Sequence, residues 1–136
     1  MNKYLARLIS AERPAIDVLR LVLCGLLFTH GTYRYFDGTI PKLGEILESH
    51  GFPYGLILAN MVNLAETGGV ALLVMRLMLW PVCSVLILIY AVGIFLFHRH
   101  LGFFVVGPGS GGWEYSALII TCLAVIMWEN RAHKLV

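Results

Sequence analysis

The chain has 136 residues, of which 59% are hydrophobic and only 13% are charged, with a mean hydropathy of +0.80. This composition excludes an ordinary soluble globular protein and predicts an integral membrane protein whose main partner is the lipid bilayer. The net charge of +2 is spread along the chain, so we expect no nucleic-acid binding.

Four apolar runs are long enough to cross a bilayer, which takes about 20 helical residues. They are Ala15–Phe36, Pro53–Met75, Leu77–Phe97 and Trp113–Asn130, and the last is the shortest. Only short tails and connections remain between them. We therefore expect an all-α membrane protein, a four-transmembrane-helix bundle with short interfacial helices, in which residues 1–136 form a single integral membrane domain.

The segment before the first run, Lys3–Arg13, predicts a short helix on the membrane surface, because its apolar and basic residues fall on different faces. We expect no cleaved signal peptide after it, because Asp17 and Arg20 interrupt the start of the apolar run. These two charged residues are three apart. They predict either an interfacial ion pair or side chains that reach out to water.

Basic residues are more frequent on one side of the predicted spans than on the other. Those on the richer side are Lys3, Arg7, Arg13, Arg76, Arg131 and Lys134. The positive-inside rule then predicts a multi-pass protein of the inner (plasma) membrane with both termini in the cytoplasm.

Glu66 lies near the middle of the second run, where an ionised carboxylate costs about 2.5 to 3.5 kcal/mol. His30 and Arg34 are four apart and share one face in the outer half of the first run. Because consecutive spans are antiparallel, we expect Glu66 to pair with His30 or Arg34. Gly68 and Gly69 predict a close helix approach beside it. The group is either a charge-balanced structural plug or a site for a proton or a polar ligand.

The first external connection, residues 37–52, predicts another interfacial helix, with Pro41 in its first turn and Gly51 just beyond its end. The third connection contains a glycine-rich stretch, residues 107–112, which breaks helices. These two loops are the largest parts of the chain outside the predicted spans.

Three further residues lie at the external ends of the third and fourth runs. His98 ends the third run, and Glu114 and Tyr115 begin the fourth. We expect them to line an external mouth together with Arg34, although a carboxylate in a first helical turn also suits the helix dipole. His98 and His100 are not at ligand spacing with cysteine or carboxylate, so we expect no metal site.

The three cysteines, Cys24, Cys83 and Cys122, lie in three different runs and form no paired motif. A membrane enzyme that exchanges disulfides needs such pairs, so this class is excluded. We expect the cysteines to be small packing residues.

Four short patches follow one another along the chain. They are Leu19–Phe28 with His30-Gly31 and Arg34-Tyr35-Phe36; Glu66–Gly69 leading to Arg76; His98 ahead of Gly102-Phe103-Phe104; and Gly111–Tyr115. In order and spacing they resemble the DoxX family of small four-helix membrane proteins, over about residues 16 to 128. At the position of Arg34 the family more often has lysine. This difference is not neutral, because the guanidinium of arginine is a planar fork of donors whereas the ammonium of lysine is a point charge.

The resemblance implies a four-helix bundle and, in some members, a small subunit of a thiosulfate:quinone oxidoreductase. We therefore expect a quinone-linked oxidoreductase subunit for a sulfur compound or another small substrate, with a polar intramembrane site open to the external side. Glu66 and His30 are the candidate proton relay, and Arg34, His98, Glu114 and Tyr115 the candidate ligands of a quinone or a small anionic substrate. The sequence encodes no redox centre, so electrons require a bound cofactor or a redox protein partner.

Two other functions remain open. Relatives that accompany redox enzymes imply a non-enzymatic membrane scaffold or accessory partner of a soluble redox enzyme, for which residues 37–52 and 103–112 would matter most. A small ligand carrier needs two access states, and no inverted repeat is evident. The substrate, the partner and the formation of a homo-oligomer stay open.

Overall fold

The computed structural model describes residues 12–106 and 111–131, and within them all regular elements are helical. This confirms the all-α class. In chain order the elements are α2 (Pro14–Phe36), α3 (Ile40–Ser49), α4 (Gly55–Leu64), η1 (Ala65–Gly69), α5 (Val70–Val74), α6 (Leu79–Gly93), η2 (Ile94–His98), η3 (Arg99–Leu101) and α7 (Glu114–Arg131). The predicted surface helix Lys3–Arg13 lies almost wholly outside the described residues.

Three continuous helical stretches are long and apolar enough to cross a membrane. They are Pro14–Phe36, Gly55–Val74 and Leu79–Leu101, and they match the first three predicted runs to within a few residues. The fourth run is occupied by α7, which has 18 residues and carries glutamate near both ends. Its apolar part is therefore shorter, and a count of four spans stays a prediction.

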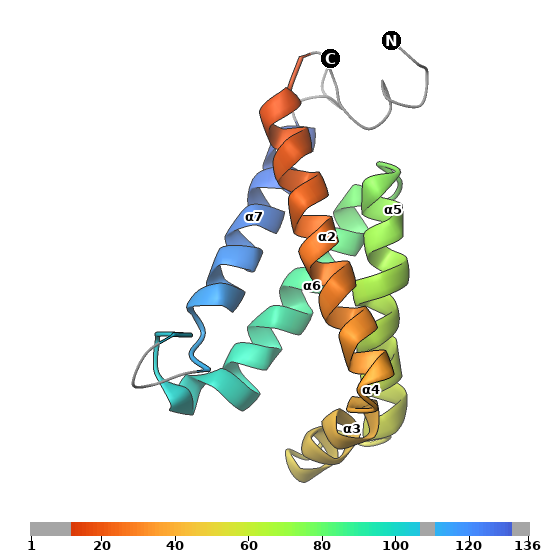
Figure 1. The fold of residues 1–136 in the computed structure, drawn as a ribbon, viewed down its shortest axis with the longest axis vertical. Coiled ribbons are helices and arrows are strands. Elements are labelled where there is room, and N and C mark those ends of the chain that lie inside the picture. Colours follow the sequence, from red (N-terminus) through yellow and green to blue (C-terminus); the bar gives the residue numbers. More distant parts are fainter. Residues whose placement is uncertain (1–11, 107–110, 132–136) are drawn as a thin grey trace.

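Figure 1 shows how these helices are arranged. The helix α2 packs against the continuous helix α4–η1–α5 on one side and against α7 on the other, while α6 packs against α7, α5 and η1. We refer to the end of the bundle that holds Pro14 as the terminal end, and to the end that holds Phe36 as the distal end. The short helix α3 lies across α4 at the distal end (Figure 1).

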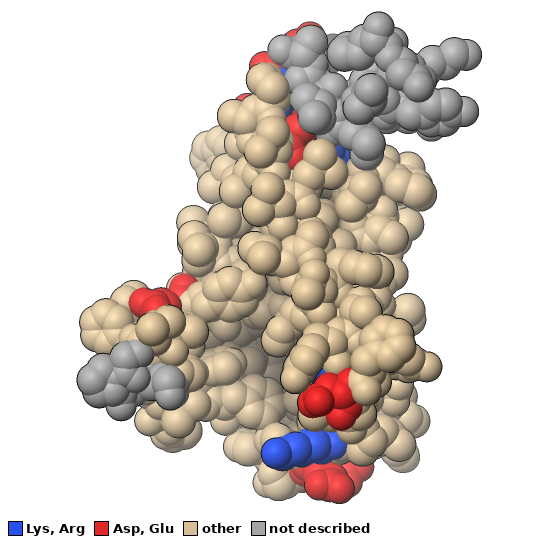
Figure 2. Space-filling model, viewed as in Figure 1, with Lys and Arg blue, Asp and Glu red and all other residues tan. Residues whose placement is uncertain are grey.

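On the face shown in Figure 2, charged side chains lie at the top, at the left edge and at the bottom, and uncharged residues cover the area between them. Many large apolar side chains are exposed, such as Leu64, Leu88 and Leu118 at 66%, 63% and 59%. A soluble monomer rarely exposes so much contiguous apolar surface. The pattern is that of helices whose outer faces contact lipid.

The buried core lies between α2, α5, α6 and α7. Its members are Leu23, Cys24, Leu27, Val70, Leu73, Cys83, Leu86, Ile119, Leu123 and Ile126. Cys24 and Cys83 are free thiols in this core, and Cys122 is a half-buried free thiol packed against it. The prediction that the cysteines serve as packing residues is confirmed.

A polar cluster closes the terminal end between α2 and the turn after α5. Asp17 forms ion pairs with Arg20 and Arg76, and the guanidinium of Arg20 also donates to the carbonyl oxygens of Leu73 and Val74 at 2.5 and 2.8 Å. These carbonyls end helix α5 and need such donors. Of the two predicted alternatives, the ion pair of Asp17 with Arg20 is confirmed, and Arg20, which is only 1% exposed, does not reach out to water.

The predicted helix in the first external connection is confirmed as α3, with Pro41 in its first turn and the left-handed Gly51 beyond its end. Its contact with α4 is very close at Gly44. A methyl group added there would lie 2.9 Å from the backbone N and Cα of Leu56. Only glycine allows the two backbones to approach in this way.

We predict that Gly44→Ala lowers the free energy of unfolding by about 1 to 3 kcal/mol, because the added methyl overpacks a backbone that cannot move aside. Thermal unfolding in mild detergent, followed by circular dichroism, measures the change. Gly93→Ala is the matched control, because a methyl at Gly93 meets nothing within 4 Å and helical alanine is favoured over glycine. Equal melting temperatures for both variants would contradict the close contact.

Candidate functional site

Glu66 lies in a π-helical turn, η1, at the middle of the helical stretch Gly55–Val74, and its side chain is buried with 1% exposure. A π-helical turn inserts one residue into the α-helical repeat, and such turns are frequent at functional sites. Here the turn shifts which residues of α4 and α5 face α2 and α6. The hydropathy pattern of the sequence did not predict this turn.

Both carboxylate oxygens of Glu66 accept a hydrogen bond from another helix. Arg34 of α2 donates from Nη1 to Oε2 at 2.6 Å, and Tyr90 of α6 donates its hydroxyl to Oε1 at 2.9 Å. We call these three residues the Glu66 triad. A buried carboxylate is tolerated when its charge is paired and its lone pairs are satisfied, and the triad meets both conditions.

The close helix approach beside Glu66 comes from Gly31 of α2. A methyl group at Gly31 would lie 3.1 Å from Cβ of Glu66 and 2.9 Å from Cγ2 of Thr67. The predicted glycines contribute less, since Gly69 faces a side chain of α6 at 3.4 Å and Gly68 meets only Leu64 of its own helix. The prediction named the correct pair of helices for the close approach. The glycine that makes the contact, however, lies on α2 and not on the helix that carries Glu66.

Tyr90 is a member of the triad that sequence reasoning missed. A usable signal was present, because its hydroxyl lies within the apolar third run and a buried tyrosine hydroxyl normally finds a partner. A tyrosine on the third run and a glutamate on the second are candidates for such a pair.

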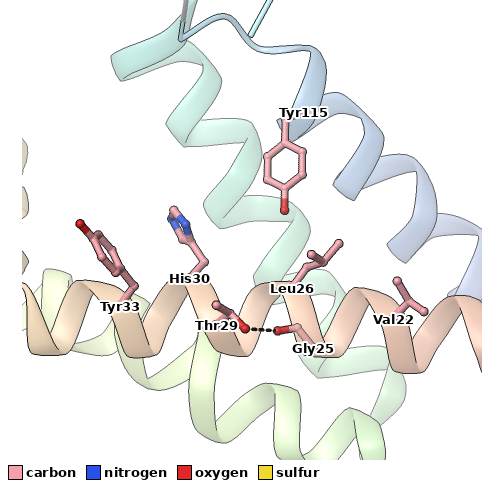
Figure 3. Close-up of a pocket in the computed structure, with 7 residues that line it drawn as sticks. All are labelled: Val22, Gly25, Leu26, Thr29, His30, Tyr33 and Tyr115. Atoms are coloured by element: carbon pink, nitrogen blue, oxygen red, sulfur yellow. Dashed lines mark hydrogen bonds between the residues drawn. The ribbon is translucent and has the colours of Figure 1, made fainter. Parts of the chain in front are cut away.

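His30 is not hydrogen-bonded to Glu66; it lies in an open groove between α2 and the start of α7. The groove has a volume of about 510 Å³ and is lined by Val22, Gly25, Leu26, Thr29, His30, Tyr33 and Tyr115. In Figure 3 the side chains of His30 and Tyr33 project from α2 toward this side, and the hydroxyl of Tyr115 points back at α2. We call this space the α2–α7 groove.

The α2–α7 groove and the Glu66 triad are neighbours. Glu66 interacts electrostatically with both His30 and Tyr115, and Tyr115 also interacts with Tyr90. The Glu66 carboxylate therefore lies near the polar groups of the groove and forms no hydrogen bond with them. A buried carboxylate, Glu66, thus lies close to a groove that contains a histidine, His30.

A further buried polar atom lies one helical turn from Glu66. Asn63 of α4 is 9% exposed, and its Oδ1 has no hydrogen-bond partner among the described residues. A buried amide oxygen without a donor is costly and calls for a water or a ligand donor. Sequence reasoning did not single out Asn63.

His98 and Glu114 hold the third connection rather than line the α2–α7 groove. The ring Nδ1 of His98 hydrogen-bonds to the carbonyl oxygen of Gly111 at 2.7 Å, and Glu114 accepts the backbone N–H of Val105 at 2.9 Å. Of the residues expected at the mouth, Tyr115 lines the groove and Arg34 belongs to the triad. The part of the chain that the structure describes contains no cluster of three metal-binding side chains.

The comparisons with known proteins give one match. The DoxX family model matches residues 15–99, which include Arg34, Glu66, Tyr90 and His98. No curated protein and no solved structure matches the chain.

We predict that Arg34→Met lowers the free energy of unfolding by about 3 to 5 kcal/mol, because it leaves the buried charge of Glu66 without its counter-ion. The double variant Arg34→Met with Glu66→Leu should recover part of this loss, since it removes both charges. Unfolding of the detergent-solubilised protein measures both. Arg99→Met, at an exposed arginine, is the control, and a similar loss in that variant would refute the assigned role of the ion pair.

Proposed function

Because the chain belongs to the DoxX family, we propose that it is the membrane subunit of a quinone-linked oxidoreductase, and that the quinone ring binds in the α2–α7 groove. The observation that carries the proposal is a buried carboxylate, Glu66, packed against Gly31 of α2, which is the residue next to His30 of the groove. Ligand sites of this kind combine apolar walls with a few well-placed polar groups.

The groove offers what a quinone ring needs. Val22 and Leu26 supply apolar walls for the flat ring, while the imidazole of His30 and the hydroxyl of Tyr115 can each donate a hydrogen bond to a ring oxygen. Among the described residues Arg34 hydrogen-bonds only through Nη1, so its other N–H groups remain as donors for an anionic substrate.

Reduction of a quinone to a quinol consumes two electrons and two protons. In our proposal His30 hands protons to the ring oxygens one at a time, and Glu66 replaces each proton through an ordered water between the two side chains, which form no direct hydrogen bond. Arg34 and Tyr90 position the Glu66 carboxylate. The electrons come from a redox protein partner that oxidises a sulfur compound or another small substrate.

The proposal includes a membrane orientation. With α7 as the fourth span, the whole chain forms one membrane domain with both termini in the cytoplasm of a plasma membrane. The distal end, with the polar half of the groove, then faces the external side. Basic residues near the terminal end, such as Arg13 and Arg76, support this orientation.

A non-enzymatic scaffold is the second candidate, and the third connection favours it. Backbone hydrogen bonds join Gly102, Phe103 and Phe104 to residues 112–114, and Glu114 fixes Val105. The side chain of Phe104, in the segment fixed by these hydrogen bonds, is 63% exposed. An exposed aromatic side chain on a segment fixed in this way offers a surface on which a soluble redox enzyme can dock.

We predict that His30→Ala and Tyr115→Phe each weaken binding of a tail-less dimethoxy-methyl-benzoquinone about tenfold, the equivalent of one lost hydrogen bond, at roughly 1.4 kcal/mol. Isothermal titration of the protein in lipid nanodiscs measures the dissociation constants. Tyr54→Phe is the matched control for Tyr115→Phe, because Tyr54 is exposed and does not line the groove. If the quinone fails to bind, or binds both groove variants as tightly as the wild type, the scaffold function is favoured.

The proton role of Glu66 has its own test. Electrochemical reduction of the bound quinone should change a carboxyl carbonyl band in the infrared difference spectrum, because Glu66 exchanges its proton as the quinone is reduced. Glu66→Gln should lose this band, while Glu45→Gln, at an exposed site on α3, should retain it. A wild-type spectrum without any carboxyl band would exclude the relay and leave the binding site standing.

A further inference from the structure

A second groove lies on the other side of α2, between α2 and α5. It has a volume of about 480 Å³, and its lining includes Leu21, Phe28, Val70, Val74 and Met75. All of its lining residues are apolar or glycine or cysteine. We call it the α2–α5 groove.

The two grooves share one residue, Gly25, which lines both of them. Gly25 is exposed, and a methyl group added to it would meet nothing within 4 Å. Larger side chains stand on either side of it along α2, with Leu21 before it and Phe28 after it. Gly25 therefore forms an open notch in the surface of α2, and the notch connects the α2–α7 groove with the α2–α5 groove.

We infer that the α2–α5 groove binds the isoprenoid tail of the quinone, and that the tail crosses α2 through the notch at Gly25. This inference rests on the proposed function, which places the quinone ring in the α2–α7 groove. Hydroxyl and imidazole side chains occur in the α2–α7 groove and not in the α2–α5 groove; they are those of Thr29, His30, Tyr33 and Tyr115. The arrangement therefore matches a molecule with one polar end and a long hydrocarbon chain.

Charge favours a quinone tail over the acyl chain of a phospholipid. The lining of the α2–α5 groove contains no cation that would bind the phosphate of a phospholipid, so the groove offers contacts to hydrocarbon alone. Arg20 and Arg76, which follow the groove toward the terminal end, are already paired with Asp17. The α2–α7 groove, in contrast, provides uncharged donors that suit the ring oxygens of a quinone.

The test compares two probes on one blocking variant. Ala71→Phe fills part of the α2–α5 groove from α5, at an exposed position that does not line the α2–α7 groove. We expect it to weaken binding of a benzoquinone with a two-isoprenoid tail about tenfold, because most of the tail loses its apolar contacts. Binding of the tail-less benzoquinone should stay within about twofold of the wild type, because Ala71 lies outside the ring site. Titration in nanodiscs, with concentrations referred to the lipid phase, gives both constants.

Ala124→Phe is the matched control, because Ala124 is exposed on α7 and lines neither groove. It should leave both affinities unchanged. Equal weakening of both probes by Ala71→Phe would overturn the tail groove. An unchanged affinity for the tailed probe would also overturn it. If neither probe binds the wild type, the proposed function itself fails.

A cross-linking measurement tests the same inference without a variant. A benzoquinone whose isoprenoid tail ends in a photoreactive diazirine should label Ala71 or Met75, which line the α2–α5 groove. Excess unlabelled tailed quinone should compete with the label. Label found on α6 or α7 instead, or label displaced equally well by phospholipid, would overturn the assignment.

Discussion

The burial of one carboxylate constrains the whole distal half of this protein. Glu66 is taken out of contact with lipid and water, and its charge is balanced by Arg34 while its second oxygen is bound by Tyr90. Those partners come from α2 and α6, so a single group fixes three helices in register. Buried ion pairs contribute little net stability, but breaking one is expensive, and this makes the arrangement specific.

The terminal end has a polar cluster of its own, built on Asp17, Arg20 and Arg76. Between the two polar clusters the contact of α2 with α5 is apolar, through residues such as Leu23 and Val70. Both clusters tie α2 to the helix Gly55–Val74 and the turn after it, while an ion pair of Arg13 with Glu129 joins the start of α2 to the end of α7 at 3.5 Å. The groove that Tyr115 and His30 line lies at the other end of α7, away from this ion pair.

The described geometry separates residues by role. Arg34 and Tyr90 hold a carboxylate, and His30 and Tyr115 face a space that a ligand can enter. His98 and Glu114 secure a loop at the distal end. A protein that only needed four helices in register would not require a titratable histidine facing an open groove beside a buried acid, and this combination supports a functional site over a structural plug.

The sequence by itself determined the all-α membrane class, the positions of the first three apolar helices, the helix α3 and the need of Glu66 for a cationic partner. These follow from hydropathy, helix-ending residues and the cost of a charge in lipid, which are local properties. Only the tertiary structure decided that Arg34 rather than His30 pairs with Glu66, that Tyr90 joins them, and that Gly31 makes the close contact. Rotation about the helix axes and the π-helical turn set these contacts, and both depend on packing between helices that are distant in sequence.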